Sequence, residues 1–174
     1  MIESQAGTAE SQRHLTDDVV QALRHKGLYG TLVPKCLGGH ESDLVTALLV
    51  SRELVRADGS VGWCFMAQMC WNSAVGAYMG DSAVKEIFKN DNTDIIIAGQ
   101  GMPNGTAEKV DGGYIVNGNW RFGSGITHAE YVQFGCIVTN DGIPQFRENG
   151  GPLIERCIHT LHKTAMMYEA GKTY

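Results

Sequence analysis

The spacing of apolar residues changes once along the chain, between Asn90 and Asp94. Before this point the apolar residues recur at helical intervals, and after it short β-branched or aromatic runs alternate with turn residues. Four helical stretches are expected, at residues 16–27, 42–56, 60–79 and 82–89. Helices followed by antiparallel strands predict an α+β fold. We expect an N-terminal antiparallel helical domain over residues 1–92 and a β domain over residues 93–174.

The expected helices have recognisable ends. Thr16 is a fitting N-cap for the first, and Gly27 closes it. The second begins at Ser42 or Asp43, and its many apolar residues predict burial on more than one side. Ser60 is the expected cap of the third.

The stretch from Ser60 to Met79 contains no charged side chain and has about the length that spans a bilayer. It also holds polar residues such as Gln68 and Asn72, and no basic cluster flanks it. A central buried helix is therefore expected, with no membrane association. The polar, acid-containing start from Met1 to Glu10 is unlike a signal peptide.

Strands are expected in the second half, at residues 95–98, 107–110, 114–116, 119–122 and 131–138. The dipeptides Asn104-Gly105, Asp111-Gly112 and Asn117-Gly118 lie between several of these runs. Asparagine or aspartate followed by glycine is a strong hairpin signal, because both residues tolerate positive φ. Three tight turns are therefore predicted.

The charge and the cysteines narrow the class of protein. The formal net charge is −5 and no basic stripe is present, so nucleic acid is not an expected partner. The five cysteines are odd in number and form no CxxC pair. Reduced, buried thiols in a cytoplasmic protein are the expectation.

Two apparent motifs are rejected. The run from Gly99 to Asn104 lacks the third glycine of a dinucleotide fingerprint and leads towards a strand instead of a helix. His159 and His162 stand at i, i+3, which on a helix would place them on one face, but no third ligand accompanies them. No metal site is predicted.

The stretch from Gly112 to His128 is the most informative one. A hairpin at Asn117-Gly118 would feed a strand in which Trp120 and Phe122 share one face. The strand would end in Gly123-Ser124-Gly125, where bare backbone and one hydroxyl can approach a ligand. An aromatic wall beside such a turn suits a flat ring with polar edges. Taken alone, the same pattern is also typical of a core strand followed by a loop.

The order of several motifs resembles the acyl-CoA dehydrogenase superfamily, most closely its flavin-dependent monooxygenase branch, the oxygenase components of two-component hydroxylases. The matching motifs cover about residues 15–155. They are Gly27-Leu28 with Pro34 and Gly38-Gly39, Asp58 to Trp63, Pro103 to Gly105, Gly112 to Tyr114, Gly118 to Trp120, and Phe122 to Gly125 with His128-Ala129.

This resemblance implies the roles of the residues in the glycine turn. Trp120, Phe122, Gly123, Ser124 and Gly125 would lie beside the isoalloxazine ring of FMN or FAD. Ser124 would be catalytic, because a hydroxyl near flavin N5 supports the reaction of reduced flavin with oxygen in such monooxygenases. A separate flavin reductase would supply the reduced flavin, the substrate would be a small aromatic or polycyclic molecule, and a homo-oligomer is expected.

The chain departs from the family pattern at two places. Phenol hydroxylases of this branch often carry a substrate-handling His in the third helix, where Trp71 and Asn72 stand here. Trp cannot accept a phenol proton, so the substrate class is open. Trp71, Asn72 and His128 are the candidate substrate contacts.

The resemblance also implies three domains: an N-terminal helical domain, a middle domain with an antiparallel β-barrel, and a C-terminal helical bundle. Residues 93–174 would then be a partial middle domain. The second departure follows Arg156, where the sequence no longer resembles the family and the bundle does not follow. Three hypotheses stay open. The chain belongs to a flavin monooxygenase, complete or truncated, or to an acyl-CoA dehydrogenase acting on a CoA thioester, or it is a non-catalytic remnant or interaction domain.

Overall fold

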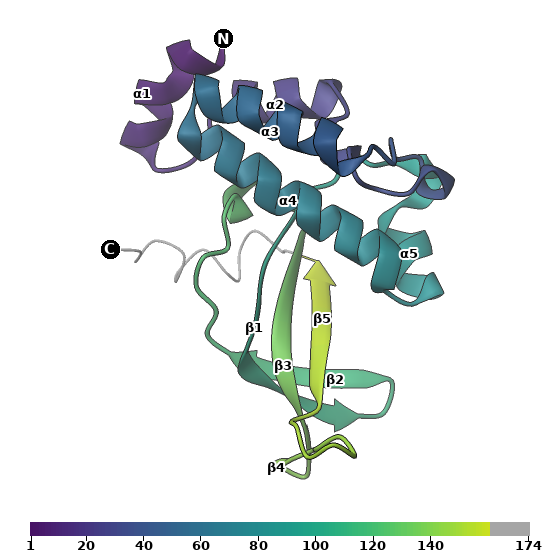
Figure 1. The fold of residues 1–174 in the computed structure, drawn as a ribbon. Helices are drawn as coiled ribbons and strands as arrows, with labels where there is room; N and C mark the ends of the chain where they lie inside the picture. Colours follow the sequence, from purple (N-terminus) through teal and green to yellow (C-terminus); the bar gives the residue numbers. More distant parts are fainter. Residues whose placement is uncertain (161–174) are drawn as a thin grey trace. The chain divides into compact units, whose positions relative to one another are not determined.

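The computed structural model describes residues 1–160, which form two compact units (Figure 1). The first unit comprises Met1–Ala98 together with Ser124–Glu130. The second comprises Gly99–Gly123 and the described residues from Tyr131 to Thr160. The compact units thus change at Ala98 and again within the glycine turn, while the predicted domain boundary at residues 92 and 93 stays a prediction.

The first unit begins with two helices, α1 (Ile2–Gln12) and α2 (Asp17–His25). Helix α1 was not expected, and none of its residues is buried. Helix α2 begins as predicted, because the Thr16 hydroxyl accepts a hydrogen bond from the Val19 amide at 3.4 Å. Its apolar face is buried, and Gly27 follows the last turn with a φ of 64°.

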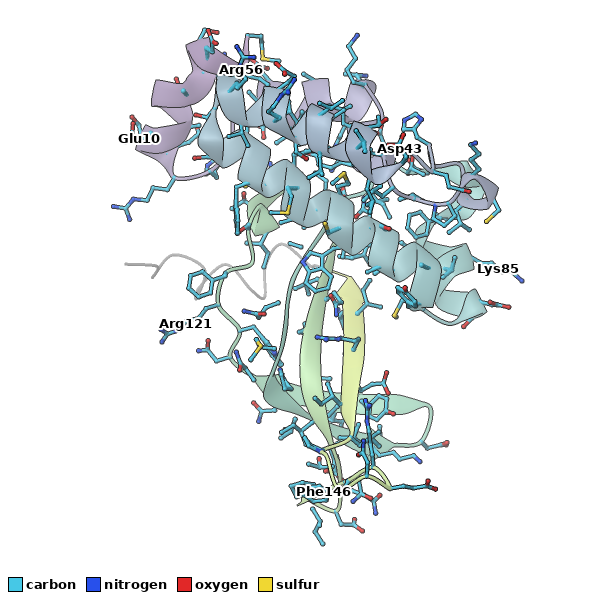
Figure 2. The ribbon with its side chains drawn as sticks, in the orientation of Figure 1. Glu10, Asp43, Arg56, Lys85, Arg121 and Phe146 are labelled. Atoms are coloured by element: carbon cyan, nitrogen blue, oxygen red, sulfur yellow. The ribbon has the colours of Figure 1, made fainter. Side chains whose placement is uncertain are left out.

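Two long helices follow, α3 (Leu44–Ala57) and α4 (Gly59–Tyr78). Asp43 caps α3 through the Thr46 amide at 3.0 Å, as predicted, and Asp43 and Arg56 mark the two ends of this helix in Figure 2. The cap of α4 is Asp58, which accepts from the Val61 amide at 2.8 Å, so the prediction of Ser60 was wrong. The aspartate reaches the amide three residues ahead, as an N-cap must.

Helices α3 and α4 pack around a small apolar core. Ala47, Phe65 and Met69 form its buried centre, with half-buried leucines and a valine around them. Gly62 lets the two helices approach closely, since a Cβ there would lie 2.3 Å from a methyl carbon of Val55. Ala47 is the one buried residue of α3. The prediction that α3 is buried on more than one side was therefore wrong within this structure.

The remaining elements of the first unit are short. They are α5 (Asp81–Ile87) and the 3-10 turns η1 (Leu28–Gly30), η2 (Lys35–Leu37), η3 (Lys89–Asp91) and η4 (Ile126–His128). The segment holding η4 returns to the first unit, where the Glu130 amide donates to the Ile96 carbonyl at 3.0 Å.

The second unit is built on a mostly antiparallel sheet. Its strands are β1 (Ile97–Val110), β2 (Gly113–Gly118), β3 (Tyr131–Asn140), β4 (Ile143–Pro144) and β5 (Ile154–Thr160). The order is β2-β1-β3-β4, and β5 also pairs with β3 (Figure 1). The β1–β2, β3–β4 and β3–β5 pairs are antiparallel. Helices followed by this sheet confirm the predicted α+β class.

One of the three predicted turns is present. Asp111-Gly112 joins β1 to β2 in a tight hairpin, with Val110 opposite Gly113. Asn104-Gly105 lies inside β1, and Asn117-Gly118 is the end of β2, where Gly105 pairs with Gly118. These two turn predictions were wrong, because both glycines make room for the ring of Trp120. A Cβ on Gly105 would lie 2.3 Å from that ring, and one on Gly118 would lie 2.6 Å from it.

The predicted strand at residues 119–122 is absent. This segment has no regular structure, and Phe122 adopts a left-handed φ of 62°. The shared strand face expected for Trp120 and Phe122 therefore does not exist. His159 lies on β5 instead of a helix, and His162, the other histidine of the i, i+3 pair, lies outside the described residues.

The cysteines and the helices bear on two further expectations. All five cysteines are free thiols, but Cys36 and Cys70 are exposed, so the prediction of uniformly buried thiols was wrong. Burial raises the pKa of the Cys64 thiol to about 11. Within residues 1–160, no helix combines the length and the apolar character needed to cross a membrane.

Candidate functional site

The Ser124 hydroxyl has a defined partner within the first unit. The indole nitrogen of Trp63, on α4, donates a hydrogen bond to the Ser124 Oγ at 2.9 Å. Indole nitrogen is a donor only, so the serine oxygen must be the acceptor. The serine keeps its own hydrogen and one further lone pair for another group. Ser124 is half-buried, and 59 % of the Trp63 surface is exposed.

The backbone after Ser124 is fixed by a glycine. Gly125 has a φ of +76°, and a Cβ added there would lie 1.8 Å from the Gln68 amide nitrogen. A side chain is therefore excluded by conformation and by space. Gln68 is only 1 % exposed, and its Oε1 has no hydrogen-bond partner among the described residues. The turn rests directly on the buried amide of α4.

An ion pair fastens the end of the same segment. The Arg24 guanidinium contacts the Glu130 carboxylate at 2.5 Å and also donates to the carbonyl oxygens of Asp94 and His128. The second carboxylate oxygen of Glu130 accepts from the Ile96 amide at 2.7 Å. The Arg24 side chain is 15 % exposed. A partly buried, charge-assisted network of this kind holds a segment in one geometry.

His128 is held inside the first unit. Its Nε2 lies 2.9 Å from the Leu15 carbonyl oxygen, and its Nδ1 lies 3.6 Å from an Asp17 carboxylate oxygen. The ring meets His14 edge to face, with 5.6 Å between the ring centroids. Burial lowers the pKa of His128 below its usual value. These contacts give the His128 ring a structural role. Its predicted contact with substrate or flavin stays a prediction.

Asn72 is fully buried and its amide is engaged. The amide nitrogen donates to the carbonyl oxygens of Tyr29 at 3.2 Å and Ile95 at 2.8 Å, and the amide oxygen accepts from the Ile97 amide at 3.2 Å. Both amide hydrogens are used, so no donor is left for a substrate. Asn72 thus ties α4 to the start of β1, and we do not include it in the proposed site. Its neighbour Trp71 is half-buried.

Trp120 and Phe122 lie in the second unit and differ in their surroundings. The Trp120 ring stacks on Phe134 with 4.8 Å between centroids, and its indole nitrogen donates to the Gly135 carbonyl at 2.9 Å. Phe122, by contrast, is 75 % exposed. Its position in the chain can be found in Figure 2 from the label of the preceding residue, Arg121. Trp120 therefore has a packing function, and flavin contacts of Trp120, Phe122 and Gly123 stay predictions.

The first unit thus joins three predicted residues, Ser124, Gly125 and His128, to side chains that the sequence did not single out. Trp63 and Gln68 are the missed residues, both on α4. Trp63 closes the Asp58 to Trp63 motif that was noted for its resemblance, but nothing in the motif indicated its partner. Gln68 was noted only as a polar residue in an uncharged helix.

The chain belongs to the acyl-CoA dehydrogenase family. Residues 1–89, half of the chain, match the family model described as "Acyl-CoA dehydrogenase, N-terminal domain". This match confirms the resemblance inferred from the ordered motifs.

Curated relatives and solved structures agree with this assignment. The oxygenase subunit HsaA of a flavin-dependent monooxygenase from Rhodococcus jostii is 33 % identical over 145 residues, which are 82 % of this chain and 37 % of the relative. Indole-3-acetate monooxygenase from Acinetobacter baumannii is 34 % identical over 130 residues, 75 % of this chain and 33 % of the relative. The crystal structure of the HsaA monooxygenase from M. tuberculosis matches with a TM-score of 0.81 at 29 % identity, covering 91 % of this chain and 40 % of that one.

The alignments cover most of this chain but a much smaller share of each relative. The chain spans between a third and two fifths of the length of these relatives.

Proposed function

We propose that this chain is part of the oxygenase component of a flavin-dependent monooxygenase that uses reduced flavin and O2 on an aromatic substrate. The observation that carries the proposal is the Ser124 hydroxyl, which lies on a glycine turn packed against Gln68. Its own hydrogen is not used in the bond that it accepts from Trp63. Its place in the ordered motifs of the family supports the same reading. The named relatives favour a monooxygenase over an acyl-CoA dehydrogenase.

The residues around Ser124 fit a flavin. A hydrogen-bond donor beside an exposed indole ring suits the polar edge and flat face of a conjugated heterocycle. When bound, reduced flavin would supply the two electrons with which one oxygen atom of O2 enters the substrate and the other leaves as water. Ser124 would donate its hydrogen bond towards developing negative charge, which a preorganised donor stabilises. Gly125 would keep that donor in place.

Three finer points belong to the same proposal. A flavin reductase would deliver reduced FMN or FAD, as the oxygenase-subunit name of one relative suggests. The substrate would be a small aromatic molecule, in keeping with the indole-3-acetate named for another. A homo-oligomer in the cytoplasm remains the expected state.

Flavin binding tests the proposal at its base. The purified chain would be titrated anaerobically with FMN and with FAD, each oxidised and dithionite-reduced, and bound flavin measured after ultrafiltration. We expect one of the two flavins to bind, more tightly when reduced. Ser124→Ala should retain binding while changing the ratio of the two dissociation constants. If neither flavin binds in either redox state, the proposal is wrong and the non-catalytic hypothesis remains.

A further inference from the structure

We infer that Trp63 is a positioning residue for the Ser124 hydroxyl, an assignment that rests on the proposed flavin function. The two residues lie 61 positions apart in the sequence and meet through the 2.9 Å bond from the indole nitrogen to Oγ. Because Trp63 occupies one lone pair of the oxygen, the serine hydrogen points to some other group. Because the hydroxyl accepts a hydrogen bond from the indole, its own hydrogen is directed away from Trp63 and can be donated to a ligand.

Both partners of this bond are held by independent contacts. On the Trp63 side, Asp58 caps α4 and the preceding residue, Gly62, packs tightly against Val55. On the Ser124 side, Gly125 rests on the buried Gln68 amide. The bond therefore joins two fixed points, and its geometry does not depend on a mobile side chain finding a partner.

The environment of the bond argues against a purely structural role. Trp63 is 59 % exposed, whereas buried apolar residues make up the core of this unit. A single neutral hydrogen bond contributes about 0.5–1.5 kcal/mol net, and less where water can replace it. A tryptophan kept at the surface beside a catalytic candidate thus adds little to folding. Its N–H does polarise the serine hydroxyl, because hydrogen bonds in a chain strengthen one another.

Trp63→Phe is the direct variant, since it retains a six-membered aromatic ring and removes the N–H donor together with the five-membered ring that holds it. Ser124→Ala removes the other partner, and the double variant completes a cycle. Tyr78→Phe is the matched control, because it also removes one polar hydrogen from an exposed aromatic residue of α4.

The first measurement needs no flavin. In a ¹H–¹⁵N spectrum of the chain, Ser124→Ala should move the Trp63 indole signal upfield and speed its hydrogen exchange, and Tyr78→Phe should leave both unchanged. If the position and the hydrogen exchange of the indole signal are unchanged in Ser124→Ala, the bond does not form in solution and the inference is overturned.

The second measurement is the ratio of dissociation constants for oxidised and reduced flavin. Trp63→Phe should change this ratio about 2- to 10-fold, in the direction of Ser124→Ala, and should have no further effect in the Ser124→Ala background. Additive effects of the two substitutions, or an unchanged ratio, would overturn the inference while leaving the proposed function intact. Absence of flavin binding by the unaltered chain would overturn both.

Discussion

At the residue scale, Gly125 is the position of the candidate site that tolerates substitution least. Its φ of +76° costs an alanine about 1–2 kcal/mol, and the Gln68 amide leaves no space for a Cβ. We expect Gly125→Ala to lower the free energy of unfolding by about 2–4 kcal/mol, measured by urea denaturation.

Gly142→Ala is the matched control for Gly125→Ala. Its φ of +74° is almost the same, but a Cβ there would meet nothing within 4 Å. It should lose only the conformational part, about 1–2 kcal/mol. Equal losses at the two positions would contradict the close contact between the turn and Gln68.

His128 gives the first unit a dependence on pH. Burial lowers the pKa of this imidazole below its usual 6.5, so the unfolded chain binds protons more readily than the folded one. The stability is fully present above pH 6.5 and is lost as the pH falls through the lower folded pKa. Asp17, which faces the ring, favours the protonated form, while His14 and Arg24 oppose it.

The measurement is the melting temperature between pH 8 and pH 5. We expect a fall over this range that is smaller in His128→Asn than in the unaltered chain. All other residues are the same in both proteins, so the comparison isolates the contribution of His128. A variant with the same or a steeper fall would show that His128 is not held in a neutral, buried form.

At the element scale, the outer face of α3 is the feature that sequence patterns misjudged. Leu44, Val45 and Leu48 are each at least 65 % exposed, whereas Ala47 is 3 % exposed. Apolar residues predict burial in some contact, but they do not say whether that contact lies within the chain itself. The caps were predictable for the opposite reason. Thr16 and Asp43 act on amides three residues away, so local sequence contains the whole interaction.

Neighbouring positions on α3 test this assignment of faces. Leu48→Lys should change the free energy of unfolding by less than about 0.5 kcal/mol, because the Leu48 side chain is exposed and is not part of the core. Ala47→Leu should lower it by about 1–3 kcal/mol, because the added carbons overfill the space beside Phe65 and Met69. Chemical denaturation of the two variants measures both values. A large loss in Leu48→Lys would mean that this face is covered in the isolated chain.

The turns show a second limit at the element scale. Asp111-Gly112 obeyed its local preference, whereas Gly105 and Gly118 are glycines because the Trp120 ring lies against them. A glycine that makes room for a long-range contact cannot be told apart in the sequence from a glycine that is needed for its positive φ. The strand expected at residues 119–122 failed with them, because it depended on a hairpin at Asn117-Gly118.

At the scale of the whole molecule, the order of the motifs predicted more than any one of them. The α+β class and the family followed from the succession of capped helices, strands and glycine turns. The partners of Ser124 and Gly125 did not follow, because Trp63 and Gln68 reach them from α4 through contacts that only folding creates. The candidate site is therefore predictable as a segment and not as a set of contacts.

The central claim is that a flavin binds at the Ser124 turn. Its most direct test is a ¹H–¹⁵N spectrum of the chain recorded anaerobically during addition of reduced FAD or FMN. We predict that the Trp63 indole and the Gly125 amide signals move with saturation, while the Val45 and Leu48 amides on the outer face of α3 do not. Shifts confined to α3, with the turn unchanged, would contradict the account.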